Sequence, residues 1–253
     1  MGEAMVECLL TKKVASPQDM VVSDISPVRR ELLSREYGVS TLDDNRKAVT
    51  NADLIILAVK PQNLPQVMAE IRTPSPKQLV LSIVAGATLS SLCQGLNHAS
   101  VIRAMPNMPA QIGEGMTIWT ATTGTGRKQK ALAQTVLRAL GKEIYITDEK
   151  YLDMATALSG SGPAYVFLFI EALVDAGVHI GLPRNIAQEL VIQTILGSTL
   201  TVERTGKHPA DLRNMVTSPG GTTTEALLQL EKGRFRSLIL KAVAAAYKKA
   251  KRF

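Results

Sequence analysis

The residues best suited to bind an anion form a short segment late in the chain, Ser218-Pro219-Gly220-Gly221-Thr222-Thr223. Thr222 and Glu225 have the spacing of a capping box, which predicts that a helix begins here with its first backbone amides free. Two glycines ahead of the helix let another molecule approach those amides, and a helix N-terminus of this kind attracts a carboxylate. The same pattern is typical of a well-capped surface helix, so these residues alone leave both interpretations open.

A second set of residues has the spacing of a dinucleotide site. Gly2, in Met1-Gly2-Glu3-Ala4, suits the last glycine of a G-x-G-x-x-G turn, where it lets a helix pack closely on a strand. Asp24 ends an apolar run at the place where, about 20 residues further on, an acid binds the ribose. A single glycine is a weak signal, however, and Asp24 is equally suited to begin a turn.

Two more apolar runs end in residues that suit a ligand. Residues 54–59 are followed by Lys60 and Pro61, and residues 81–84 run into Ala85 and Gly86. Ligands of open α/β sheets bind at the carboxyl ends of strands, so Lys60 is placed to reach a ribose or phosphate oxygen. The small residues at the second end leave room for a flat ligand. The plainer alternative for Lys60 is an exposed loop lysine.

These candidate sites need a sheet to position them, and the sequence pattern predicts one. Up to about residue 147, β-branched runs alternate with amphipathic stretches, which indicates a mostly parallel sheet covered by helices. We expect strands at residues 20–24, 54–59, 79–84, 101–104, 116–120 and 143–146, and helices at 27–37 and 129–140. The fold class is therefore α/β, with a Rossmann-like dinucleotide-binding domain over residues 1–150.

Residues 151–253 form a second domain, in which the pattern is helical at 164–180, 184–204, 223–232 and 235–251. The helix that begins at Ala164 is apolar nearly all round, with Glu171 and Asp175 as its main polar residues. Such a helix must be buried on most sides. So small a domain offers little interior, which favours an intertwined homodimer over the alternative of a monomeric bundle.

The composition argues against several classes of protein. The net charge is +7, but basic residues are spread along the chain and aromatic residues make up only 4%, so we expect no nucleic-acid binding. Cys8, Cys93 and the isolated histidines have no spacing partners for a disulfide or a metal. The longest apolar run, residues 165–170, is shorter than the roughly 18 residues of a membrane helix. We expect a cytoplasmic protein without metal or membrane partners.

A series of motifs follows in order along the chain: Ala58-Val59-Lys60-Pro61, Ala85-Gly86, Arg103-Ala104-Met105-Pro106-Asn107, Leu158-Ser159-Gly160-Ser161-Gly162-Pro163, Ser218-Pro219-Gly220-Gly221-Thr222-Thr223 and Gly233-Arg234-Phe235-Arg236. Together they resemble the pyrroline-5-carboxylate reductases. The resemblance implies a Rossmann domain, an all-helical dimerisation domain, and reduction of 1-pyrroline-5-carboxylate to L-proline with NADPH, or NADH in some members. It also implies dimers that often assemble further, commonly into decamers.

Carried over residue by residue, the resemblance places cofactor contacts on Gly2, Ser23, Asp24, Asn45, Ala58, Val59, Lys60, Pro61, Ile83, Val84 and Ala85. It places substrate contacts on Glu149, Ser218, Gly220, Gly221, Thr222 and Thr223. A protonated ring imine is already electrophilic, so such an enzyme must chiefly position the imine carbon against the nicotinamide. The catalytic residue would be Thr223, whose hydroxyl could hydrogen-bond the ring nitrogen or relay its proton.

The chain departs from the family at its start, because members carry a first strand and leading glycines before the equivalent of Met1. We interpret this as a late-assigned start or a truncation, and without that strand we expect a sheet that lacks a central member, weak nucleotide binding and low stability. Cofactor choice stays open, since Asp24 suits NADH, whereas Ser23, Ser26, Arg29 and Arg30 suit the extra phosphate of NADPH.

Two rival functions are compatible with a sheet domain followed by helices. A β-hydroxyacid dehydrogenase needs a basic lysine on the first long helix after the domain junction, and residues 164–180 contain none. The other rival is a nucleotide-binding dimer without catalysis, which a broken dinucleotide motif would favour.

Overall fold

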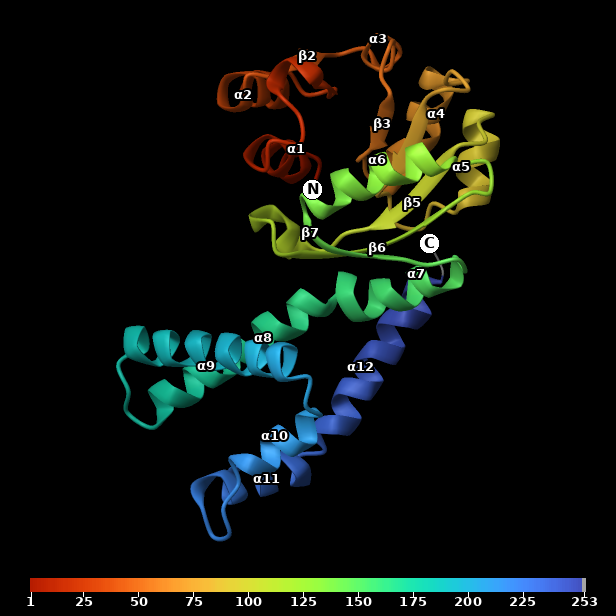
Figure 1. Cartoon of the computed structure of the whole chain (residues 1–253). Helices are drawn as coiled ribbons and strands as arrows, with labels where there is room; N and C mark the ends of the chain where they lie inside the picture. Colours follow the sequence, from red (N-terminus) through yellow and green to blue (C-terminus); the bar gives the residue numbers. More distant parts are fainter. Residues whose placement is uncertain (252–253) are drawn as a thin grey trace. The chain divides into compact units, whose positions relative to one another are not determined.

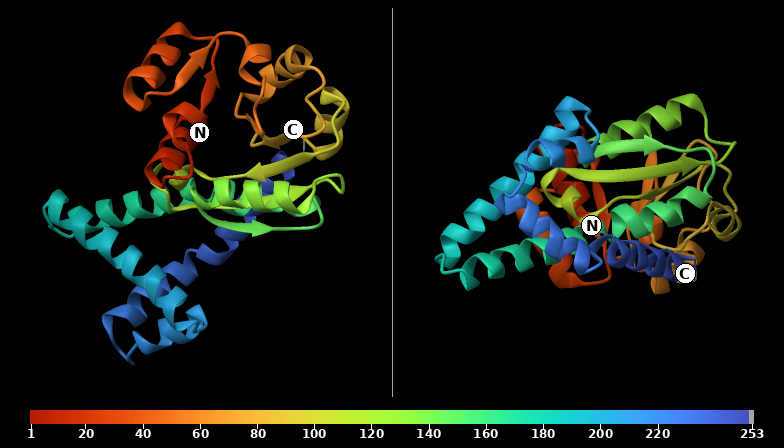
Figure 2. Two further views of the ribbon diagram at one scale, coloured as in Figure 1. Left: turned by 45° about the horizontal axis from the view of Figure 1, so that its top comes forward. Right: turned by 90° about the horizontal axis from the view of Figure 1, so that it is seen from below.

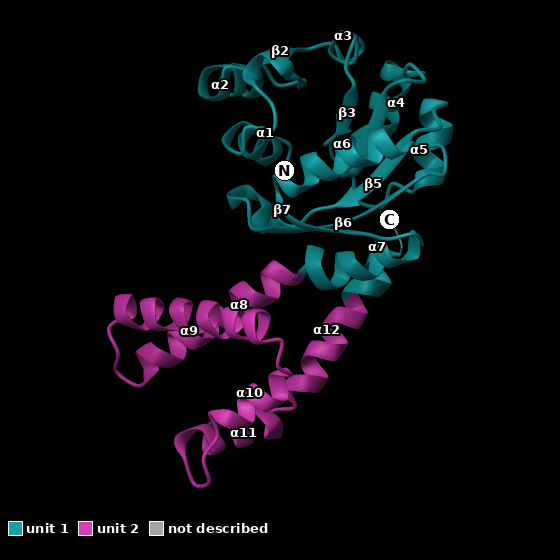
Figure 3. Cartoon of the chain, viewed as in Figure 1, with its two compact units in different colours: residues 1–161, 246–253 teal, residues 162–245 magenta. Residues whose placement is uncertain are grey.

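The computed structural model describes residues 1–251, which form two compact units. The first unit runs from Met1 to Ser161 and includes the described residues from Ala246 on, and the second covers Gly162–Ala245 (Figure 3). The first is an α/β unit and the second is helical. The predicted fold class is therefore confirmed.

The first unit is built on a five-stranded sheet. Its strands are β3 (Leu54–Leu57), β4 (Leu79–Ser82), β5 (Val101–Met105), β6 (Gly115–Ala121) and β7 (Gly141–Tyr145), and they lie in this order across the sheet. All neighbours are parallel except β5 and β6, which are antiparallel. Each strand was predicted from its β-branched run, and the expectation of a mostly parallel sheet is confirmed.

Helices cover both faces of this sheet (Figure 1). Leu79 and Leu81 of β4 belong to one core cluster, with residues of α1 (Gly2–Thr11) and α6 (Arg127–Arg138). Val80 points to the opposite face, where it belongs to a cluster with α4 (Leu64–Ile71) and α5 (Leu89–Leu96). Because side chains alternate along a strand, an apolar run such as Leu-Val-Leu must be covered on both sides.

Two further strands form a small parallel sheet of their own, β1 (Val21–Ser23) with β2 (Ser40–Leu42). The helix α2 (Pro27–Tyr37) connects them, capped at its start by Ser26 and ended by Gly38 in the left-handed conformation, φ 69°. A separate small core of Val6, Leu33 and Val39 holds this part to α1. Within residues 1–251, β1 is paired only with β2 and β3 only with β4, so the strands of the dinucleotide-binding region lie in two sheets.

Short elements complete the first unit. They are α3 (Asn45–Ala48), α7 (Lys150–Ala155), the 3-10 turns η1 (Pro17–Asp19), η2 (Pro61–Asn63) and η3 (Met108–Ile112), and the π-helical turn η4 (Thr156–Gly160). A π-helical turn within a helix is rare and is often found at functional sites. Here it separates α7 from the first helix of the second unit.

The second unit consists of α8 (Gly162–His179), α9 (Arg184–Thr205), α10 (Pro209–Met215), α11 (Thr222–Lys232) and α12, which spans Phe235–Ala250 and runs into the first unit. α8 and α9 diverge from the turn that connects them (Figure 2), and near that turn Ala187 of α9 packs against Gly177 of α8. The helical periods predict these helices except α10, a short helix whose start is marked only by the His208–Pro209 pair.

The described part of the chain leaves α8 mostly exposed. Val174 is its only buried residue, whereas Phe167 is 48% and Leu168 66% exposed. A monomeric bundle with α8 at its centre is therefore wrong. By length and composition alone, the helical stretch over residues 150–179 is also apolar enough to cross a membrane, with 11% of its most apolar window buried. A helix of this kind needs a cover outside the chain.

Candidate active site

The start of α1 lies directly against the end of β3. A Cβ added at Gly2 would lie 3.3 Å from the Cβ of Ala58, closer than most such contacts. Close packing of the first helix on a strand is the role of the last glycine in a dinucleotide fold, so these residues fit a bound dinucleotide. Ala58 and Lys60 are exposed beside this contact. The structure thus brings together the cofactor candidates from α1 and from β3.

The loop after β4 lies beside the same strand end. The Ile83 amide donates to the Leu57 carbonyl at 3.0 Å, so the chain leaves β4 next to the exit from β3. Ile83 and Ala85 are partly exposed, and Gly86 follows with φ 78°, a conformation that favours glycine. Val84 is 3% exposed and packs in the core, so it could contact a nucleotide only through its backbone.

At the end of β1, Asp24 is already bound within the protein. Its carboxylate accepts a hydrogen bond from the Ser26 amide at 2.8 Å, and its carbonyl accepts one from Arg30 at 2.6 Å. Asp24 thus begins a turn, which was the alternative interpretation from the sequence. Its second carboxylate oxygen can still accept a hydrogen bond from a ribose. Asn45, the candidate on α3, donates to Glu70 at 2.6 Å.

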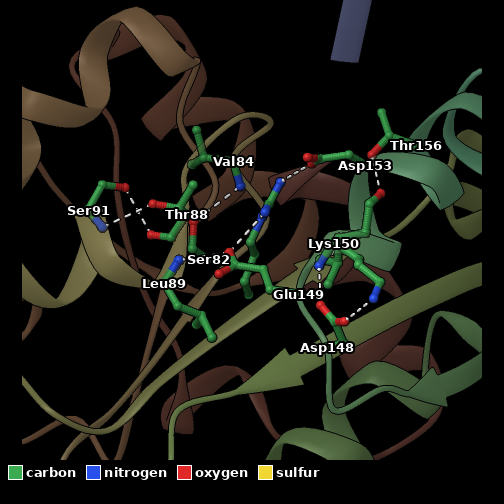
Figure 4. A network of polar contacts seen from close by, with 12 residues as sticks. Ser82, Val84, Thr88, Leu89, Ser91, Asp148, Glu149, Lys150, Asp153 and Thr156 are labelled. Atoms are coloured by element: carbon green, nitrogen blue, oxygen red, sulfur yellow. Dashed lines mark hydrogen bonds and ion pairs between the residues drawn. The ribbon is translucent and has the colours of Figure 1, made fainter. Parts of the chain in front are cut away.

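A buried arginine joins three elements near these loops. Arg103 of β5, 7% exposed in its side chain, donates to Glu149 and to Asp153, both at 2.9 Å. Glu149 accepts a second bond from the amide of Leu89, the first residue of α5, at 2.8 Å. Figure 4 shows Glu149, the residue before α7, close to Leu89 at the start of α5 and to Ser82, the last residue of β4. The network therefore fixes α7 to the segment that follows β4.

Glu149 was predicted as a substrate contact, and one of its oxygens is taken by this network. Arg103 had no role assigned from the sequence, although it lies in one of the motifs that carry the resemblance. The one local sign of an ion pair here is the arginine itself, because it lies within the apolar run of β5, where a buried charge needs a partner.

The same motif reaches the π-helical turn through Asn107. Its amide nitrogen donates to the Ser159 carbonyl at 3.2 Å, and its amide oxygen accepts from the Met116 amide at 2.8 Å. Asn107 therefore ties the turn to β6. Arg103 and Asn107 together hold both ends of the segment that leads from the sheet into α8.

The predicted anion loop lies in the second unit, and its helix begins one residue earlier than expected. The N-cap of α11 is Gly221, with no side-chain cap, so Thr222 is the first helical residue and the capping box of Thr222 with Glu225 is wrong. The physical reason is that Gly221 adopts the extended N-cap conformation itself, φ −79° and ψ 165°. The hydroxyl of Thr224 donates to the Ser218 carbonyl at 2.7 Å instead.

This geometry leaves backbone donors available. Among the described residues, the amides of Thr222 and Thr223 have no hydrogen-bond acceptor, as expected for the first turn of a helix. Gly220 has φ 69°, a backbone conformation that favours glycine, and a Cβ added at Gly221 would lie 3.1 Å from the Ser218 carbonyl oxygen, so that position favours a small residue. The segment from Ser218 to Thr223 is thus a compact loop that can bind a carboxylate.

A mostly parallel sheet with strand ends that fit a nucleotide, followed by a helical unit, is the Rossmann-type arrangement of many nucleotide-dependent enzymes. Residues 1–86 match the family model described as NADP oxidoreductase, coenzyme F420-dependent. Residues 149–253 match the model for pyrroline-5-carboxylate reductase dimerisation. The pyrroline-5-carboxylate reductase of Synechocystis is 42% identical over 99% of this chain and 93% of its own length. The chain belongs to the pyrroline-5-carboxylate reductase family.

Solved structures agree with this membership. A pyrroline-5-carboxylate reductase from Coxiella burnetii is 37% identical with a TM-score of 0.90, covering 99% of this chain and 94% of that one. The Plasmodium falciparum enzyme with NADP bound is 31% identical with a TM-score of 0.91, covering 100% of this chain and 94% of that one. A prephenate dehydrogenase from Aquifex aeolicus, 14% identical with a TM-score of 0.55, shares the fold alone.

Proposed function

We propose that this protein reduces 1-pyrroline-5-carboxylate to L-proline with NADPH. The observation that carries the proposal is the pair of free amides at the start of α11, in a chain related along its whole length to enzymes of that name. These amides bind the carboxylate of a small anionic substrate, and the helix dipole adds to that attraction.

The residues of the chain act mainly by positioning. When bound, the nicotinamide supplies a hydride, and the protonated ring imine accepts it without a strong acid from the protein. The backbone amides of Thr222 and Thr223 hold the substrate carboxylate. The Thr223 hydroxyl hydrogen-bonds the ring nitrogen.

The cofactor candidates divide by the part of the nucleotide that they suit. Gly2 lets the pyrophosphate approach the amides at the start of α1. Asp24 and the neighbouring serines suit the adenosine ribose, and the loop from Ile83 to Ala85 suits the nicotinamide end. Support comes from the contact of Gly2 with Ala58 and from the adjacent exits of β3 and β4.

A second copy of the chain buries the exposed apolar surface of α8. The dimerisation-domain match over residues 149–253 supports self-association, and further assembly into a decamer is part of the proposal. We place the enzyme in the cytoplasm, where Cys8 and Cys93 stay reduced; both are free thiols in the structure.

The test is spectrophotometric. Purified protein is mixed with NADPH, and absorbance at the nicotinamide band is followed after addition of 1-pyrroline-5-carboxylate or, separately, of a 3-hydroxyacid with NADP⁺. The proposal predicts NADPH oxidation with the first substrate alone. Turnover with the hydroxyacid alone would favour the dehydrogenase alternative, and binding of NADPH without any turnover would favour a non-catalytic dimer.

A further inference from the structure

An ion pair lies between the two helices that flank the expected adenosine end of the cofactor. The Arg29 guanidinium of α2 is 2.6 Å from the Glu3 carboxylate of α1, and the Tyr37 hydroxyl donates to the same carboxylate at 3.4 Å. The hydrogen bond from Arg29 lowers the pKa of Glu3, so the carboxylate is ionised at neutral pH. Both side chains stay partly exposed, 41% for Arg29 and 35% for Glu3.

The two neighbouring arginines of α2 are used differently. Arg30 reaches back to the Asp24 carbonyl, at the end of β1. Arg29 is directed to Glu3, the residue that follows Gly2 at the start of α1. A 2′-phosphate on the adenosine ribose is accommodated by arginine near the end of the second strand of a dinucleotide fold. Glu3 is therefore paired with one of the two arginines that could bind such a phosphate.

We propose that Glu3 sets the preference between NADPH and NADH, because its carboxylate competes with the 2′-phosphate for Arg29. The proposal rests on the cofactor site described under the proposed function. For NADPH to gain the full charge of Arg29, the ion pair must open or share its guanidinium, and the Glu3 carboxylate repels the incoming phosphate. NADH lacks that phosphate, and its binding does not require Arg29.

An exposed ion pair is weak, so Glu3 adjusts the preference between the two nucleotides and does not decide it alone. We expect Glu3→Gln, which keeps the shape of the side chain and removes its charge, to raise the affinity for NADP⁺ relative to NAD⁺ roughly two- to fivefold. The matched control is Glu7→Gln. Glu7 lies one turn further along α1 and also interacts with Tyr37, whereas Arg29 is paired with Glu3.

The experiment is isothermal titration calorimetry of the full chain with NADP⁺ and with NAD⁺, at one ionic strength. We expect the affinity for NADP⁺ relative to NAD⁺ to rise in Glu3→Gln and to stay nearly unchanged in Glu7→Gln. A double variant, Glu3→Gln with Arg29→Met, should lose the gain. Circular dichroism melting of each variant shows that it is folded. The ratio of the two affinities, measured on the same sample, does not depend on the fraction of active protein.

The outcomes separate this inference from the proposed function. Equal changes of the ratio in both single variants, or a gain that persists without Arg29, would overturn the role of Glu3 and leave the reductase assignment intact. Failure of the unchanged protein to bind either nucleotide would count against the cofactor site itself, and with it against both proposals.

Discussion

The Arg103 guanidinium donates to Glu149 Oε1 at 2.9 Å, and the same oxygen accepts the Leu89 amide at 2.8 Å. One carboxylate oxygen thus joins β5, α5 and the start of α7. Since Arg103 is nearly buried, its charge depends on the carboxylates around it. The position of the predicted substrate contact Glu149 therefore depends on Arg103, a residue to which the sequence assigned no role.

Replacing Arg103 with methionine should destabilise the protein by roughly 2 to 4 kcal/mol, somewhat below the value for a fully buried pair because the carboxylates are partly exposed. The variant leaves Glu149 and Asp153 without their shared cation. Urea unfolding followed by circular dichroism measures the loss. Arg184→Met is the control, since its pair with Asp175 is exposed on both sides and should cost less than about 1 kcal/mol.

Removing the Thr223 hydroxyl should slow the reaction. We expect Thr223→Ala to lower kcat roughly ten- to a thousandfold, within the range that positioned proton-transfer groups contribute. Thr223→Ser keeps the hydroxyl and should retain most of the activity. Steady-state kinetics with both variants decides the point, and an alanine variant with unchanged kcat and KM would remove Thr223 from the mechanism.

Adding a methyl group at Gly221 should disturb the anion loop. The new Cβ would lie 2.6 Å from the Ser218 hydroxyl, which can rotate away, and 3.1 Å from the Ser218 carbonyl oxygen, so the loop backbone must shift slightly. Because the free amides of α11 follow directly, we expect Gly221→Ala to raise KM for the substrate by about tenfold or more, with nucleotide affinity unchanged. A rise in the nucleotide dissociation constant of similar size would show that the loop serves the cofactor instead.

Glu143 should make stability depend on acid pH. Burial raises its pKa, but hydrogen bonds from Trp119, Gln134 and Arg138 outweigh that effect, so the pKa of Glu143 lies below its usual value. Hydrogen bonds to a charged group contribute about 1.5 to 3 kcal/mol. A lowered folded-state pKa means that this stabilisation is fully present above the unfolded-state pKa and is lost as pH falls through the folded-state value.

Unfolding free energies of the unchanged protein and of Glu143→Gln, measured by urea between pH 7 and about pH 3, test this assignment. The difference between the two proteins should be largest at neutral pH and shrink on acidification. A difference that stays constant over that range would mean that the charge of Glu143 is not what stabilises β7 against α6.

The sheet and the long helices could be predicted because their signals are local. Leu79 to Ser82 is an apolar run of strand length, and Ser26-Pro27 with Gly38 marks both ends of α2. β2 has only three residues, Ser-Thr-Leu, and it contains no apolar or β-branched run that would distinguish it from a loop. The cap of α11 was misplaced by one residue because a glycine can occupy the N-cap as readily as a threonine.

The Arg103 network could not be predicted from local patterns. Its partners lie 46 and 50 residues away along the chain, and only the fold brings them together. The pairing of Glu3 with Arg29 across 26 residues is hidden in the same way. Sequence motifs indicated where a nucleotide and a carboxylate could bind, whereas the contacts that orient those sites come from tertiary structure.

The central claim is that hydride passes from NADPH to the ring imine, and isotope transfer tests it most directly. The protein is incubated with 1-pyrroline-5-carboxylate and NADPH carrying deuterium at both C4 positions of the nicotinamide, and the product is examined by mass spectrometry and NMR. The account predicts L-proline with a single deuterium on the δ carbon. L-Proline without deuterium, or no L-proline while the protein is folded and binds nucleotide, would contradict it.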